Sequence, residues 1–158
     1  MSRAAAPSKP ILIDDMPTEP TQALRFGKAR EARSATLTED YVELISDLLA
    51  AHGEARATEV AKRLGVTHPT ALKSIARLKR EGLASGLPYR GVFLTEVGKA
   101  LAEKVKERHR LVVEVLLALG APHEAAEADA EGMEHFVSEP TRAAMSEFLR
   151  LRRIETAS

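Results

Sequence analysis

The sequence contains no cysteine and no tryptophan, and only 4% of its 158 residues are aromatic. The absence of cysteine excludes disulfides, thiolate metal sites and a cysteine nucleophile. The shortage of aromatic side chains argues against the base-stacking platforms of single-strand nucleic-acid binders. No apolar run approaches the roughly 20 residues of a membrane-spanning helix, and the N-terminal sequence lacks the apolar core of a signal peptide. We therefore expect a cytoplasmic protein with no membrane segment.

The chain also lacks a net charge, since 23 basic side chains balance 23 acidic ones. The charges are nevertheless divided unevenly, with −2 over residues 1–52, +7 over residues 53–110 and −5 over residues 111–158. A basic segment of this kind indicates a polyanionic partner, whereas an acidic segment indicates bound cations or simple solvation. The hydrophobic content of 44% is that of an ordinary globular protein.

Residues 1–35 contain four prolines among small and polar residues, which predicts a mobile N-terminal arm. Thr38 is a good N-cap, and apolar residues follow it at helical spacing as far as Gly53. A short helix then ends at Gly65, and Thr67 caps a further helix whose apolar stripe includes Ala71, Leu72, Ile75 and Leu78. Two helices joined by such a glycine-containing turn predict a helix-turn-helix.

Residues 83–88 and 91–94 are short strand-like runs that predict a β-hairpin of the wing type. Three helices are expected after this hairpin. They begin at Thr95, Pro122 and Ser138 and reach about Leu119, Val137 and Arg153.

The predicted fold class is therefore mainly α, in two parts. A winged helix-turn-helix with a small β-hairpin wing occupies residues 36–95, and a helical metal-binding and dimerisation domain occupies residues 96–158. The apolar face around Val112 and Leu119 is larger than a thin helical layer needs, which favours a homodimer.

The second helix of the predicted pair exposes hydroxyl and basic side chains opposite its apolar stripe. The N-terminal residues of a recognition helix enter the major groove, while more distant basic side chains and the wing contact phosphates. Lysine and arginine on an outer face are often only solubilising, but the position after a helix-turn and the local charge favour DNA. The predicted DNA-binding residues are Thr67, His68, Thr70, Lys73, Arg77 and Arg90. His68 fits a plain surface position equally well.

Glu131, Glu134 and His135 lie at positions i, i+3 and i+4, so the expected helix places them on one face. Two carboxylates and an imidazole are a natural ligand set for Mn²⁺, Fe²⁺, Co²⁺ or Zn²⁺. Asp40 and Glu43 repeat the i, i+3 carboxylate pair in the first helix. A histidine between apolar neighbours, as at position 109, is more often a core residue than a ligand.

Catalytic alternatives fit this acidic segment poorly. It matches neither the His-Glu-x-x-His motif of zinc proteases nor the paired Glu-x-x-His motifs of di-iron carboxylate bundles. No glycine-rich phosphate loop and no Ser/His/Asp arrangement is present in the sequence. We therefore predict that the protein is not an enzyme.

Taken together and in order, four segments resemble the diphtheria-toxin-repressor family of metal-dependent transcriptional regulators, in its manganese-responsive branch. They are residues 39–43, 89–95, 107–109 and 129–135. The resemblance implies an operator-binding winged helix, a helical homodimerisation domain and a two-metal site between them. The ligands that it implies are Asp40, Glu43, His109, Glu131, Glu134 and His135.

The resemblance also implies a division of these ligands between two Mn²⁺ ions per subunit. One ion would be bound by Asp40 and His109, the other by Glu43 and His135, with Glu131 and Glu134 shared. The implied function is a manganese-activated repressor of manganese uptake genes that binds double-stranded operator DNA as a homodimer.

Three alternatives stay open on the sequence alone. Iron-responsive members of the same family have methionine at the position of Asp40 and a sulfur ligand in the later helix. A winged-helix regulator that senses an organic ligand would leave the carboxylates merely solvated. A small metallohydrolase would need a general base that is not also a ligand, and none is evident in the sequence.

Overall fold

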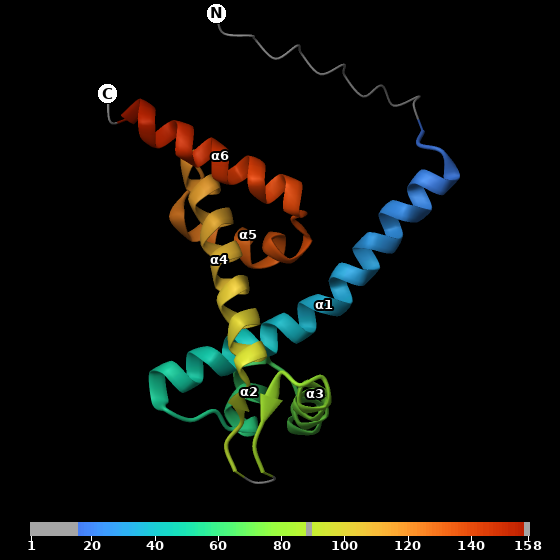
Figure 1. The fold of residues 1–158 in the computed structure, drawn as a ribbon, viewed down its shortest axis with the longest axis vertical. Helices are drawn as coiled ribbons and strands as arrows, with labels where there is room; N and C mark the ends of the chain where they lie inside the picture. Colours follow the sequence, from blue (N-terminus) through green and yellow to red (C-terminus); the bar gives the residue numbers. More distant parts are fainter. Residues whose placement is uncertain (1–15, 88–89, 157–158) are drawn as a thin grey trace, which may run out of the picture.

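The computed structural model describes residues 16–87 and 90–156 (Figure 1). Its order of elements confirms the predicted fold class, a mainly helical chain with an N-terminal helix-turn-helix and a small hairpin. The elements are α1 (Glu19–His52), α2 (Ala57–Leu64), α3 (His68–Arg80), β1 (Ala84–Ser85), β2 (Phe93–Leu94), α4 (Glu96–Ala118), α5 (His123–Met133), the 3₁₀ helix η1 (Glu134–Phe136) and α6 (Glu139–Thr156).

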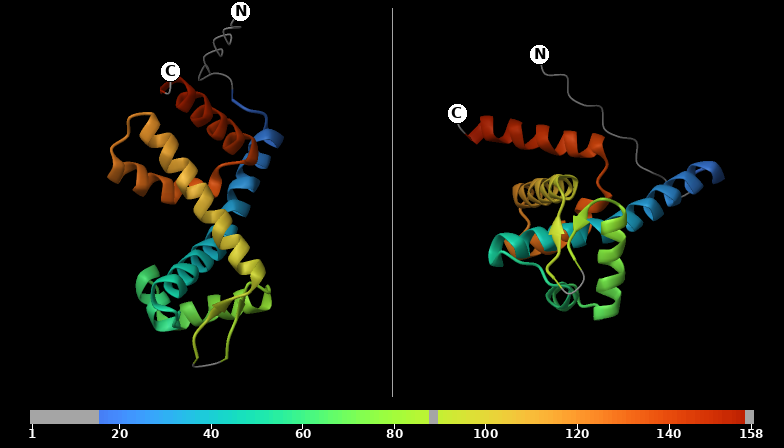
Figure 2. Two further views of the ribbon diagram at one scale, coloured as in Figure 1. Left: turned by 60° about the vertical axis from the view of Figure 1, so that its left-hand side comes forward. Right: turned by 60° about the horizontal axis from the view of Figure 1, so that its bottom comes forward.

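The predicted start of the first helix at Thr38 is wrong, because α1 already begins at Glu19. Pro20 lies in its first turn, where the missing N–H costs nothing. Residues 21–37 contain no proline and are rich in alanine, arginine, lysine and glutamate, which are good helix formers. The predicted arm over residues 1–35 is thus helical from Glu19 onward, and residues 1–15 lie outside the described residues. Figures 1 and 2 show this half of α1 projecting away from the helix-turn-helix.

The helix-turn-helix forms as predicted. Gly65 follows α2 with φ +66, and the Thr67 hydroxyl accepts a hydrogen bond from the backbone N–H of Thr70 at 3.3 Å. Three members of the predicted stripe of α3 are buried, but Leu72 is 48% exposed, so its assignment to the core is wrong. One residue is 100° of helix rotation, which turns Leu72 away from the single side on which α3 packs.

The hairpin pairs β1 and β2 antiparallel, with Ala84 opposite Leu94. These strands are shorter than predicted, and the tip at residues 88–89 lies outside the described residues. The Thr95 hydroxyl accepts from the N–H of Gly98 at 3.1 Å and donates to the carbonyl of Gly82 at 2.6 Å. A Cβ on Gly98 would lie only 2.0 Å from the Leu83 carbonyl oxygen, so only glycine allows α4 to start this close to the hairpin.

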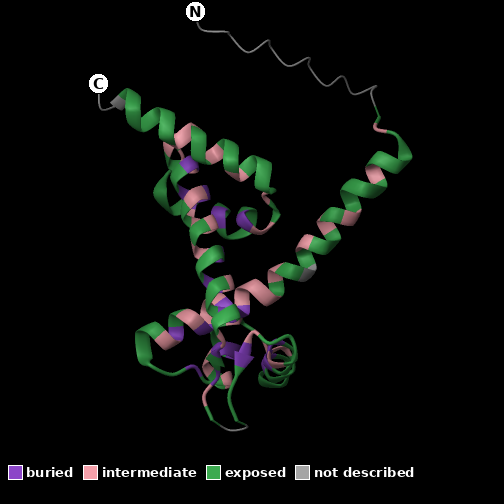
Figure 3. Ribbon diagram, in the orientation of Figure 1, coloured by how far each residue is buried: buried purple, intermediate pink, exposed green. Residues whose placement is uncertain are grey.

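Two clusters of buried side chains make up the core (Figure 3). The first surrounds Tyr41 and Ile45 of α1 and joins this helix to α2, α3, the hairpin and the start of α4. The second joins α4 and α5 around Val112 and Ala130. Because α4 runs through both clusters, it links the helix-turn-helix to the C-terminal helices. Among the described residues, no helix is long and apolar enough to span a membrane.

A candidate metal centre and a basic helix

Glu134 is the only charged side chain counted as buried in the described part of the chain, with 0% of its surface exposed. Neither of its carboxylate oxygens has a hydrogen-bond partner there. Burial raises the pKa of Glu134 to about 7, against the opposing influence of neighbouring His135. Since a buried carboxylate is costly without compensating charge, this position calls for a cation.

The two oxygens of Glu134 face different imidazoles. Oε2 lies 3.1 Å from Nδ1 of His109, in the middle of α4, and Oε1 lies 3.5 Å from Nε2 of His135, in η1. Glu131 adds a second carboxylate 3.6 Å from Nδ1 of His109. Glu134 therefore lies between two histidines that are contributed by different elements.

The predicted single helix from Pro122 to Val137 is wrong in its last turn, because α5 ends at Met133 and a 3₁₀ helix continues the chain. A 3₁₀ helix has about three residues per turn. The prediction of one continuous α-helical face through Glu131, Glu134 and His135 therefore does not describe their arrangement. His135 contacts the side chains of α1 instead.

Helix α1 supplies the other two predicted carboxylates. Oδ1 of Asp40 lies 3.2 Å from Nε2 of His135, and Glu43 lines the same cavity as His109. The expected division paired Asp40 with His109 and Glu43 with His135, whereas in the structure Asp40 contacts His135, and Glu43 only shares a cavity with His109. All six predicted ligands nevertheless meet at the junction of α1, α4, α5 and η1.

Two carboxylates outside the predicted set contact the remaining ring nitrogens. Oε2 of Glu39 lies 2.7 Å from Nδ1 of His135, and Oε2 of Glu127 lies 2.9 Å from Nε2 of His109. Arg108 also donates a hydrogen bond to Glu39. The sequence offered a signal for both, since one directly precedes Asp40 and the other lies one helical turn before Glu131.

The electrostatics of this cluster favour positive charge at the imidazoles. Hydrogen bonds to Asp40 and Glu39 raise the pKa of His135 to about 10. Burial lowers the pKa of His109, but the hydrogen bond to Glu127 and the nearby charge of Glu134 outweigh burial and leave it raised. Burial also raises the pKa of Glu43, with a further contribution from Glu131. Protons on the imidazoles therefore offset the negative charge of the carboxylates, as a divalent cation would.

The chemistry of the donors fits a hard divalent metal ion, because four carboxylates and two imidazoles meet with no sulfur ligand. Across residues 16–87 and 90–156, no three such side chains are arranged so that they could hold an ion as they stand. The imidazoles and carboxylates are paired with one another instead. Both oxygens of Glu134 and Nδ1 of His109 are buried and make no hydrogen bond in this region, although they lie within ion-pair distance of neighbouring groups. A metal ion could therefore bind these atoms without breaking a hydrogen bond.

The predicted DNA-binding residues are all exposed; five of them lie in α3 or at its N-cap, and Arg90 lies in the wing. Helix α3 has four basic side chains and no acidic one. Arg77 is restrained by an ion pair with Glu81 at 2.7 Å, and the hydroxyls of Thr67 and Thr70 lie 2.8 Å apart.

A groove between α3 and the wing brings His68 and Arg90 together. Arg56 and Lys79, which were not among the predicted DNA-binding residues, line the same groove. The ammonium group of Lys79 donates to the carbonyl of Gly86 at 3.0 Å, which ties the helix to the hairpin. The exposed Leu72 also faces this groove.

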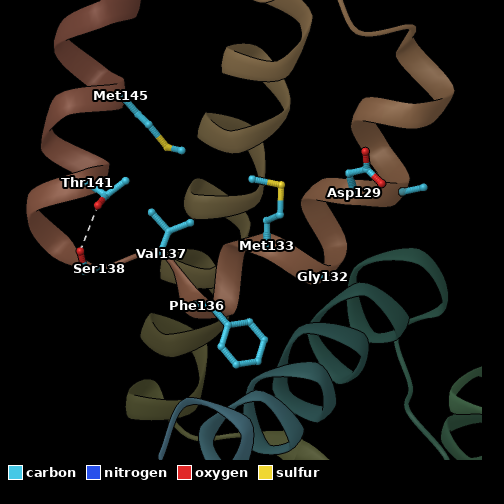
Figure 4. Close-up of a pocket in the computed structure, with 9 residues that line it drawn as sticks. Asp129, Gly132, Met133, Phe136, Val137, Ser138, Thr141 and Met145 are labelled. Carbon is cyan, nitrogen blue, oxygen red and sulfur yellow. Dashed lines mark hydrogen bonds between the residues drawn. The ribbon is translucent and has the colours of Figure 1, made fainter. Parts of the chain in front are cut away.

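A second groove lies between α5, η1 and α6 (Figure 4). Its walls are mostly apolar and include Met133, Phe136, Val137 and Met145. Met133 and Phe136 are 40% and 49% exposed. Apolar surface of this kind on a helical layer is typical of protein–protein contacts.

Two family profiles match the chain. One, described as the iron-dependent repressor N-terminal DNA-binding domain, matches residues 35–92. The other, described as the iron-dependent repressor metal-binding and dimerisation domain, matches residues 95–153. The chain belongs to the iron-dependent repressor family. It is thus a transcriptional regulator rather than an enzyme, with a DNA-binding domain followed by a domain that binds metal and dimerises.

Members of the family with substantial identity include two regulators named MntR. The transcriptional regulator MntR of Escherichia coli O157:H7 is 47% identical over 141 residues, which are 89% of this chain and 91% of that relative. The HTH-type transcriptional regulator MntR of Bacillus subtilis strain 168 is 33% identical over 100 residues, which are 63% of this chain and 70% of that relative.

Solved structures of the family have the same fold. A manganese-dependent transcriptional repressor in complex with manganese is 30% identical, with a TM-score of 0.65 over 71% of this chain and 52% of that one. The T. acidophilum IdeR structure is 26% identical, with a TM-score of 0.62 over 70% of this chain and 53% of that one. The chain spans about half the length of these solved chains.

Proposed function

We propose that this protein is a manganese-activated regulator that binds double-stranded operator DNA in the cytoplasm and mainly represses manganese uptake genes. The observation that carries the proposal is the buried Glu134, which faces His109 and His135 and has no hydrogen-bond partner in the described residues. The names of the MntR relatives and of the manganese-bound repressor support manganese as the metal.

The proposed ligands are Asp40, Glu43, His109, Glu131, Glu134 and His135, which together hold two ions per subunit. Because Glu134 contacts both imidazoles, it would be shared, with Asp40 and His135 on one side and Glu43 and His109 on the other. A bound divalent ion supplies positive charge and coordination bonds at this junction.

The position of the cluster suggests how metal binding would affect the DNA-binding part of the protein. Asp40 and Glu43 belong to α1, which shares a core with α2 and α3, whereas the other four proposed ligands belong to α4, α5 and η1. Neutralising the carboxylates removes their mutual repulsion and favours one relative placement of the two parts. A coupling of roughly 1–3 kcal/mol would change operator affinity about 5- to 150-fold, and DNA would tighten metal binding equally.

We infer that the DNA-binding part spans residues 36–95 and the metal-binding and dimerisation part residues 96–158. A twofold dimer would place two copies of α3 about one duplex turn or a multiple of one turn apart, which suits a palindromic operator. Thr67, His68, Thr70 and Lys73 would contact bases or the groove edge. Arg77 and Arg90 would contact phosphates.

Iron is the rival metal, because the family profiles carry the name of iron-dependent repressors. Asp40 is the residue that argues for manganese, since a carboxylate is a harder ligand than a thioether. We expect the variant Asp40→Met to relax discrimination against Fe²⁺. Operator binding titrated anaerobically with Mn²⁺ and Fe²⁺ measures this, and unchanged discrimination would count against the argument from Asp40.

The decisive experiment begins by selecting duplexes from a randomised library with the full chain and Mn²⁺. Fluorescence anisotropy then measures binding of the selected duplex with EDTA, with Mn²⁺ and with Fe²⁺. Mn²⁺ is expected to tighten binding at least fivefold over EDTA. Binding that EDTA leaves unchanged would overturn the proposal and favour a regulator that senses an organic ligand.

A further inference from the structure

We propose that Glu39 and Glu127 are positioning residues of the metal centre, each holding one imidazole by its outer ring nitrogen. Held in this way, His135 presents Nε2 to the ion and His109 presents Nδ1. The inference rests on the proposed function, because it assumes that a metal ion binds at the cluster.

The geometry around His135 supports the role proposed for Glu39. Its Nδ1 lies 2.7 Å from the Glu39 carboxylate and its Nε2 lies 3.2 Å from Asp40. The imidazole is 3% exposed, so it has little room to flip. A carboxylate on one ring nitrogen fixes the proton there and leaves the lone pair of the other nitrogen for a metal ion.

At His109 the roles of the two ring nitrogens are reversed. Its Nε2 lies 2.9 Å from Glu127, while its Nδ1 lies 3.1 Å from Glu134 and 3.6 Å from Glu131. Nδ1 is buried and has no hydrogen-bond partner in the described residues. The two histidines therefore turn opposite nitrogens toward the shared carboxylate of Glu134.

Glu39 is built into the fold more firmly than Glu127. Its carboxylate and the Arg108 guanidinium are each 12% exposed and paired with each other. The Arg108 guanidinium donates a hydrogen bond to this carboxylate, which fixes its position beside Nδ1 of His135. Glu127 is 45% exposed, and solvent weakens its influence on His109.

The first test titrates the full chain and its variants with Mn²⁺ alone. Loss of an outer carboxylate typically weakens metal affinity about 10- to 100-fold, so Glu39→Ala is expected in that range and Glu127→Ala near its lower end. Glu39→Gln should recover part of the affinity, because its amide oxygen still accepts from Nδ1. Circular dichroism of the metal-free variants verifies that they are folded.

Matched controls separate positioning from structure. Arg108→Ala removes the other partner of Glu39, and His123→Ala removes the 3.8 Å contact of Glu127 with His123. Glu124→Ala changes an exposed carboxylate on α5. His123→Ala and Glu124→Ala should keep Mn²⁺ affinity within about threefold of that of the unsubstituted chain, and Arg108→Ala should weaken it less than Glu39→Ala does. If Arg108→Ala weakened binding as much as Glu39→Ala, a purely structural role of Glu39 would be indicated and the inference overturned.

The second test observes the ring nitrogens directly, with ¹¹³Cd²⁺ as a diamagnetic probe and ¹⁵N-labelled histidine. One-bond coupling is expected at Nε2 of His135 and at Nδ1 of His109, and coupling at the opposite nitrogens would overturn the inference. Unchanged Mn²⁺ affinity in Glu39→Ala would overturn only this inference. An unsubstituted chain that binds no Mn²⁺ would overturn the proposed function as well.

Discussion

At the scale of single residues, the central feature is the buried carboxylate of Glu134, whose charged form is unfavourable unless a cation lies nearby. Glu134 is fully buried, and its two oxygens face His109 and His135. A residue in such a position contributes little to folding by itself, because desolvation opposes its charge. Its cost is offset when a cation is bound, which makes metal binding and folding of this region mutually dependent.

The variant Glu134→Gln is expected to lose Mn²⁺-dependent operator binding, falling to the affinity measured in EDTA. The amide keeps the shape of the side chain but removes the charge that faces both imidazoles. Mn²⁺ should raise the melting temperature of the unsubstituted chain, since a ligand at 100 times its Kd adds about 2.7 kcal/mol, and should not raise that of Glu134→Gln. Glu124→Gln, an exposed change on α5, should behave like the unsubstituted chain.

Metal binding is also expected to release protons. A ligand must be deprotonated before it binds a metal ion, and the pKa of His135 in the metal-free protein is raised to about 10. His135 is therefore protonated at neutral pH, and Mn²⁺ affinity should rise as the pH rises from 6 to 8. Calorimetric titration in two buffers of different ionisation enthalpy measures the release, and identical heats in both buffers would contradict it.

At the scale of secondary-structure elements, short polar caps fix where helices begin. Thr95 accepts from the N–H of Gly98 and donates to the Gly82 carbonyl, so one hydroxyl caps α4 and also ties it to the end of α3 and the start of the hairpin. The junction between the DNA-binding and metal-binding domains therefore depends on a local hydrogen-bond pattern.

Thr95→Ala is expected to lower the free energy of unfolding by about 1 kcal/mol, within the roughly 0.5–2 kcal/mol range of lost N-caps. Urea denaturation of the metal-free chain measures it. Thr21→Ala, which removes only an exposed contact with the hydroxyl of Thr18, should change stability by less than about 0.5 kcal/mol. Equal changes in the free energy of unfolding from both substitutions would show that the cap at α4 contributes no more than an exposed hydroxyl contact.

At the scale of the whole molecule, the protein consists of two small cores joined along α4, with the proposed metal site between them. The exposed apolar groove of α5, η1 and α6 lies within residues 95–153, the range that matches a dimerisation domain (Figure 4). A second copy that covers this surface would complete the C-terminal core.

Light scattering of the full chain at micromolar concentration is expected to give about twice the monomer mass of 17.2 kDa, with Mn²⁺ and with EDTA. The dimer should persist without metal because we expect it to form through the apolar groove of α5, η1 and α6, which contains none of the six proposed ligands. A monomer under either condition would contradict this prediction.

Much of this molecule follows from the sequence alone. The caps at Thr67 and Thr95 and the left-handed Gly65 depend on neighbours within four residues, so local rules place them correctly. The six proposed ligands were also identified from the sequence, because their residue types and spacing carry the resemblance. The start of α1 at Glu19 was not predicted from the sequence. Residues 21–37 have a weak apolar pattern, and their high helix propensity compensates for it.

The tertiary structure decided how those ligands meet. Only the packing of the helices places Asp40 beside His135 and Glu43 in one cavity with His109, and reveals Glu39 and Glu127 at the outer ring nitrogens. These contacts join residues up to 96 positions apart. Spacing along one helix determines which side chains share a face, but the distances between faces are set by the core that holds the helices together.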